Sequence, residues 1–84
     1  MKIYILKAYP TPHKWNADEA IVGYYTSKAQ LLKAVKRNAD IVGLEDWTRE
    51  AFYREWARDR IGYAGGMLET GDIEVVTANE TLNF

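Results

Sequence analysis

The fold is decided by the stretch from Lys2 to Val35, which reads KIYILKAYPTPHKWNADEAIVGYYTSKAQLLKAV. Residues 2–7 and 20–25 are rich in β-branched and aromatic side chains, a composition typical of β-strands. Ser27 and Gln30 stand at the spacing of a helix capping box, so a helix is expected to begin directly after the second strand. The stretch therefore predicts a β-hairpin with a long loop, followed by a capped helix.

The first helix is expected to span about residues 28–37. One face is apolar at helical spacing, through Leu31, Leu32, Val35 and Ala39. The positive charges of its last turn favour a helix C-terminus, and Asn38 is a suitable residue on which to end. This pattern predicts a helix that packs one side against a sheet.

A second helix is expected to begin with Thr48 as its N-cap, because Trp47 and Phe52 then occupy the two positions of a hydrophobic staple. An aromatic stripe continues along the helix as far as Ile61, and Gly62 is expected to end it. The helix is thus predicted to turn a broad aromatic face toward the core.

The remaining segments are shorter. Between the two helices, Ile41, Val42 and Leu44 are expected to lie beneath them. Residues 67–78 read as a short strand or hairpin, because apolar and polar positions alternate after a turn at residues 70–72.

These elements predict an α+β fold in the order β-β-α-α-β, with room for one further short strand. The simplest arrangement is a small antiparallel sheet with two helices packed on one face. Residues 1–84 are expected to form a single domain. Strand residues 2–7 are apolar on both sides, so the face away from the helices is expected to bind a partner or a second copy.

Composition excludes several classes of protein. The chain has no cysteine, which removes disulfides, thiolate catalysis and cysteine-based zinc sites and favours a reducing compartment. No segment approaches a membrane span or a signal peptide, so a cytoplasmic protein without membrane contact is expected. The formal net charge of −1 gives no overall attraction for nucleic acid.

Catalytic and metal-binding patterns are weak. His13 is the single histidine, and it stands in a proline-rich loop without an adjacent orienting carboxylate. The acidic pairs at residues 45–46 and 72–74 lack the spacing of a cation loop, and the glycines of residues 62–66 lack the lysine of a phosphate loop. We therefore assign no catalytic residue, no metal ligand and no cofactor.

The second helix offers a nucleic-acid alternative through four arginines, Arg49, Arg54, Arg58 and Arg60. Interleaved aromatic residues give it the composition of a nucleic-acid surface. Glu50 and Glu55 stand where they can pair with Arg54 and Arg58, so part of the charge is expected to cancel locally. At most weak nucleic-acid binding is predicted.

Protein binding is the favoured interpretation, because aromatic side chains dominate interface energetics. The loop from Tyr9 to Glu19 carries Trp15, which must either fold onto the core or meet a partner. Adjacent strand residues point to opposite faces, so one of Tyr24 and Tyr25 is expected on the open face of the sheet. The candidate binding residues are Tyr4, Tyr9, His13, Trp15, Tyr24 and Tyr25.

The segments 1–6 and 21–30, MKIYIL and IVGYYTSKAQ, resemble small phage and mobile-element proteins of unassigned function. Those proteins open with a similar strand and carry an IVG-aromatic step into a helix. The resemblance implies a phage setting and a non-catalytic module that inhibits or modulates a host protein, such as a CRISPR–Cas or other defence component. The alternatives are an RNA- or DNA-binding accessory protein and, last, a small enzyme.

Overall fold

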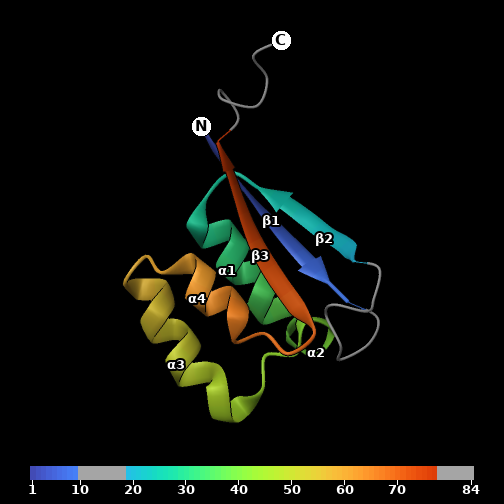
Figure 1. Ribbon diagram of the computed structural model, residues 1–84, viewed down its shortest axis with the longest axis vertical. Helices are drawn as coiled ribbons and strands as arrows, with labels where there is room; N and C mark the ends of the chain where they lie inside the picture. Colours follow the sequence, from blue (N-terminus) through green and yellow to red (C-terminus); the bar gives the residue numbers. More distant parts are fainter. Residues whose placement is uncertain (10–18, 78–84) are drawn as a thin grey trace.

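The computed structural model describes residues 1–9 and 19–77 and confirms the α+β class (Figure 1). In chain order the elements are β1 (Lys2–Ala8), β2 (Ala20–Tyr25), α1 (Lys28–Arg37), α2 (Ala39–Val42), α3 (Asp46–Ala57), α4 (Ile61–Gly66) and β3 (Gly71–Thr77). Two short helices, α2 and α4, therefore join the predicted β-β-α-α-β order.

The three strands form one antiparallel sheet in the order β2-β1-β3, with β1 in the centre (Figure 1). Between β1 and β2, Leu6 lies opposite Gly23 while Lys7 lies opposite Ile21. Val22 is thus the extra residue of a β-bulge. Because Tyr24 lies opposite Ile5, the bulge places Ile21 and Tyr24 on the same face of the sheet.

Helix α1 follows the sequence prediction closely. The Ser27 hydroxyl accepts a hydrogen bond from the backbone N–H of Gln30 at 3.1 Å, which satisfies one of the free donors at the helix start. Leu31 and Val35 are fully buried. At the other end, the Asn38 side chain donates to the Ala34 carbonyl at 2.8 Å, so both ends of α1 are held by residues that the sequence singled out.

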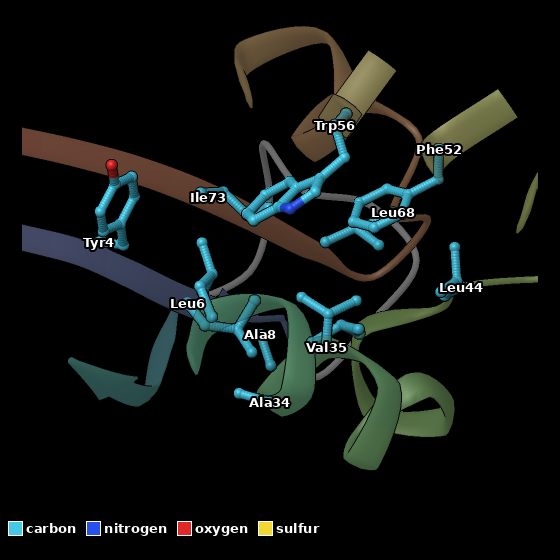
Figure 2. Packing of buried hydrophobic residues seen from close by; sticks show 13 residues of the cluster. Tyr4, Leu6, Ala8, Ala34, Val35, Leu44, Phe52, Trp56, Leu68 and Ile73 are labelled. Atoms are coloured by element: carbon cyan, nitrogen blue, oxygen red, sulfur yellow. The ribbon is translucent and has the colours of Figure 1, made fainter. Parts of the chain in front are cut away.

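The core lies on one face of the sheet. Leu6 and Ala8 of β1 and Ile73 of β3 meet Val35 of α1 and Trp56 of α3 there (Figure 2). Helix α1 packs on β1 and β2, α4 packs on β3, and α3 lies outside α4 (Figure 1). All four described helices therefore lie on the same side of the sheet.

The start of α3 differs from the prediction. The helix begins at Asp46, and its N-cap, Glu45, makes no capping side-chain hydrogen bond. Trp47 is 82% exposed, so the predicted hydrophobic staple between Trp47 and Phe52 is wrong. Phe52 is instead fully buried in the core, and Trp47 lies within the first turn of the helix rather than before it, because Glu45 is the N-cap.

The end of α3 also differs from the prediction, because the helix stops before Ile61. The helix ends at Ala57, and Asp59 adopts a left-handed conformation with φ of 63°. The chain then turns into α4, which contains both Ile61 and Gly62. A straight helix to Ile61 would lead away from the sheet, whereas the turn brings Gly65 against the backbone of Ile73.

The connector between the helices includes α2 and is tied to the start of β3. Val42 and Leu44 are buried as expected, but Ile41 is 55% exposed, so its predicted place in the core is wrong. Ile41 contacts the start of β3 through its backbone instead: the Ile41 carbonyl accepts a hydrogen bond from the Thr70 hydroxyl at 2.8 Å. The Thr70 N–H also donates to the Val42 carbonyl at 3.1 Å.

Candidate binding surfaces

Tyr4 lies on the covered face of the sheet, which corrects its predicted place in a partner-binding surface. It is only 8% exposed and points to the same side as Leu6 and Ala8 (Figure 2). The alternation of β1 decides this: the opposite set contains Lys7, which is costly to bury, while Ala8 fits beneath the helices. Tyr4 therefore stabilises the core and leaves the other face to Ile3 and Ile5.

The other side of the sheet carries a continuous apolar surface, which we call the open face and define by Ile3, Ile5, Ile21, Tyr24 and Val76. Ile5 lies directly opposite Tyr24, and Ile3 lies opposite Val76. Tyr24 is 62% exposed and Ile21 is 50% exposed. None of the described helices covers this face.

One end of the open face is polar. The Lys7 ammonium lies 3.2 Å from Glu19 Oε1 and 2.6 Å from Glu74 Oε2. The hydrogen bond with Glu74, reinforced by the one with Glu19, raises the pKa of Lys7 above its ordinary value despite the opposing effect of burial. The lysine is therefore held as a paired cation at the rim of the apolar surface.

Tyr9 belongs to this polar end. Its hydroxyl donates to Glu19 Oε2 at 3.2 Å. Burial, followed by the negative charge of Asp72 and the contact with Glu19, raises the pKa of the Tyr9 hydroxyl. The Tyr9 hydroxyl thus contacts the same carboxylate, Glu19, that pairs with Lys7. His13 and Trp15, which were also predicted to bind a partner, lie outside the described residues.

Tyr25 separates from Tyr24, as strand alternation requires. It lies opposite Tyr4 on the covered side, and its ring occupies the space above Gly23. From there it lines a surface groove of about 370 Å³ beside α1, together with Gln30, Lys33, Ala34, Arg37 and Asn38. Tyr25 therefore belongs to a different surface from Tyr24.

The four arginines of the nucleic-acid alternative do not form one surface. Arg49 pairs with Asp46 at 2.8 Å, while Arg60 lies 3.8 Å from Glu55 and 5.8 Å from the ring centre of Tyr63. Arg49 and Arg54 are five residues apart, about 140° around the helix. Arg49 therefore points away from Arg54, and the four arginines do not share one face.

The predicted pairing of Arg54 and Arg58 with Glu50 and Glu55 is wrong: neither arginine forms an ion pair within residues 1–9 and 19–77. The turn after α3 explains the change for Glu55, because the Arg60 N–H donates to the Glu55 carbonyl at 2.9 Å. That contact brings the Arg60 side chain, rather than Arg58, toward the carboxylate of Glu55.

Helix α1 carries a basic surface that the sequence interpretation missed. Its ten residues contain four cations, Lys28, Lys33, Lys36 and Arg37, and no acid. Lys28 is engaged, 3.0 Å from Asp59 and 2.7 Å from the Trp56 carbonyl. The other three are exposed. The charge pattern was visible in the sequence, but the two charges of the last turn were attributed to the helix dipole.

Metal sites and membrane-spanning helices are the next features to consider in the described part of the chain. Among the described positions, no group of three or more histidine, cysteine, aspartate or glutamate side chains could hold a metal ion. None of the helices in residues 1–9 and 19–77 combines the length and apolarity needed to cross a bilayer.

Comparisons with protein-family models, curated proteins and solved structures find no match. The assignment of function therefore rests on the surfaces themselves.

Proposed function

We propose that this protein is a non-catalytic module that binds another protein through the open face of its sheet. The observation that carries the proposal is the exposure of Tyr24, at 62%, on the edge strand β2 beside Ile5 of the central strand. Contiguous exposed apolar surface on a small domain is typical of interaction sites. Tyrosine is also among the residues that most often dominate interface affinity.

The distribution of charge favours a protein partner for this face. Among the described residues, the charged side chains of this face lie at its margins: Lys7 is paired with Glu19 and Glu74, and Glu74 lies opposite Ile5 on the edge strand β3. Protein–protein interfaces have this organisation, with an uncharged centre and a polar rim. Within residues 1–9 and 19–77, the cation of this face, Lys7, is already paired and is not free to bind a phosphate backbone.

The proposal extends to the kind of partner. The resemblance of residues 1–6 and 21–30 to small phage and mobile-element proteins supports a host protein in the cytoplasm, and a CRISPR–Cas or other defence component is the candidate we put forward. Binding to such a component would inhibit or modulate it by occupying a surface that it needs.

A pair of tyrosine variants tests the proposal. Tyr24→Ala removes the exposed ring from the open face, and Tyr63→Ala removes a 70% exposed ring from α4 as a matched control. Immobilised wild-type protein and both variants are incubated with host lysate, and bound proteins are quantified. We expect a protein retained by wild type and Tyr63→Ala to be lost with Tyr24→Ala. Its affinity should fall by about thirtyfold, corresponding to about 2 kcal/mol.

Melting curves separate a binding effect from a folding effect. Tyr24→Ala should melt close to wild type, because its ring is mostly in solvent. A partner bound equally by wild type and Tyr24→Ala would refute the proposal, as would one lost only with Tyr63→Ala. Sedimentation of the purified chain covers the remaining case: a stable dimer broken by Tyr24→Ala would assign the face to a second copy.

A further inference from the structure

Helix α1 presents three exposed cations away from the sheet. Lys33, Lys36 and Arg37 lie on the side opposite Leu31 and Val35, which are buried against the core. We define these three cations as the α1 basic face. None of the three forms an ion pair within the described residues. An unneutralised charge of +3 thus remains on a protein whose formal net charge is −1.

Two grooves flank the α1 basic face, and each contains an aromatic ring. Lys33 and Arg37 line the groove of about 370 Å³ together with Tyr25. Lys36 lies 5.2 Å above the ring of Tyr53 and lines a second groove of about 300 Å³. Cations therefore alternate with rings across the helix.

The groove beside Tyr25 also contains two side-chain amides, from Gln30 and Asn38. Amide groups can donate to and accept from the edges of a nucleobase, and a tyrosine ring offers a stacking surface. A cationic track beside an aromatic ring is characteristic of sites for single-stranded nucleic acid.

From this arrangement we infer that the α1 basic face binds single-stranded nucleic acid. Lys33, Lys36 and Arg37 contact successive phosphates, and one base enters the groove against Tyr25. The site is independent of the open face, because α1 packs on the other side of the sheet. An acidic protein would need the three cations but neither the amides nor the ring.

The test uses a labelled oligothymidylate of about twelve nucleotides, within the range of single-strand site sizes. Fluorescence anisotropy should detect micromolar binding at low salt. Three neutralised phosphates predict a slope of log affinity against log salt of about −2, a roughly fifteenfold loss between about 50 and 200 mM. An abasic strand of equal length should bind at least about fivefold more weakly, because one stacked base contributes about 1–3 kcal/mol.

Matched double variants locate the site. Lys33→Gln with Arg37→Gln removes two charges four residues apart on α1. Arg54→Gln with Arg58→Gln removes two at the same spacing at the C-terminal end of α3, where Arg58 is the C-cap; we call these the α1 pair and the α3 pair. The α1 pair should weaken binding at least tenfold and flatten the salt slope, whereas the α3 pair should leave both nearly unchanged. Circular dichroism verifies that both variants remain folded.

Four results would overturn the inference. They are no binding at low salt, loss with the α3 pair alone, equal affinity for the abasic strand, and equal affinity for a polyglutamate peptide of the same charge. The last result would assign the surface to an acidic protein. None of these outcomes bears on Tyr24, so the inference and the proposed function fail separately.

Discussion

Close backbone approach at two glycines determines how the start of β3 is joined to α2. A Cβ added to Gly71 would lie 2.6 Å from the Val42 Cβ, and one added to Gly43, where φ is 73°, would lie 2.6 Å from the Thr70 nitrogen. Both distances are shorter than real contacts allow. The junction between α2 and β3 therefore depends on residues that have no side chain.

Gly71→Ala should destabilise the protein by about 1–3 kcal/mol, because the added methyl must displace the buried Val42. Gly62→Ala is the matched control: nothing lies within 4 Å of its Cβ position, and the helix propensity of alanine should add about 0.5–1 kcal/mol. Urea unfolding measures both changes. Equal stability of the two variants would contradict the packing described at this junction.

The ion pairs of Lys7 should make the folded protein less stable at alkaline pH, where the lysine loses its charge. Its pKa is raised in the folded protein, first by the hydrogen bond with Glu74 and then by the one with Glu19. The stabilisation is therefore complete below the unfolded value of about 10.4 and is lost as pH rises toward the folded value. Melting temperatures of wild type and Lys7→Met should differ by a constant amount between about pH 7 and pH 10 and converge above it. A gap that instead changes between neutral pH and pH 10 would disprove this role.

At the scale of elements, α1 and the strands were predictable because their signals are local. Ser27, Gln30 and the spacing of Leu31 and Val35 fix α1 without any tertiary contact. The boundaries of α3 were not predictable in this way. Its start carries no local signal, because its N-cap, Glu45, makes no side-chain capping hydrogen bond. Its end is followed by Asp59, an aspartate in a left-handed turn that glycine more commonly occupies.

The sequence of β1 contains a residue that indicates which face of the strand is covered by the helices. Its two faces are equally apolar in Ile3, Tyr4, Ile5 and Leu6, so hydrophobicity alone cannot choose between them. Lys7 settles the choice, since a lysine is seldom placed under a helix. Had that residue been weighed, Tyr4 would have been assigned to the core.

Two substitutions on α3 test where the helix begins, because Trp47 and Phe52 would pack together if the predicted hydrophobic staple were present. Phe52→Ala should lower stability by about 3–5 kcal/mol, because the ring is fully buried. Trp47→Ala should change stability by less than about 0.5 kcal/mol, because its side chain is 82% exposed. Thermal and urea unfolding measure the difference. A large loss with Trp47→Ala would restore the hydrophobic staple and refute the observed helix start.

At the scale of the whole molecule, two unlike surfaces lie on opposite sides of one sheet. The open face is apolar and its edge lysine is paired, whereas the α1 basic face is cationic and flanked by rings. The sequence predicted that one of Tyr24 and Tyr25 would lie on the open face. It could not show that Tyr25 would join Lys33 and Arg37, because that groove exists only once β2 packs beside α1.

The most direct test of the central claim is photo-cross-linking from the open face. A photoreactive phenylalanine derivative replaces Tyr24 in one variant and Tyr63 in the other, since both side chains are largely exposed. After irradiation in host lysate, we expect the probe at Tyr24 to yield one covalent adduct with a different protein, and the probe at Tyr63 to yield none. Cross-linking to that protein from Tyr63 alone, or from Tyr24 only to a second copy of this chain, would contradict the account.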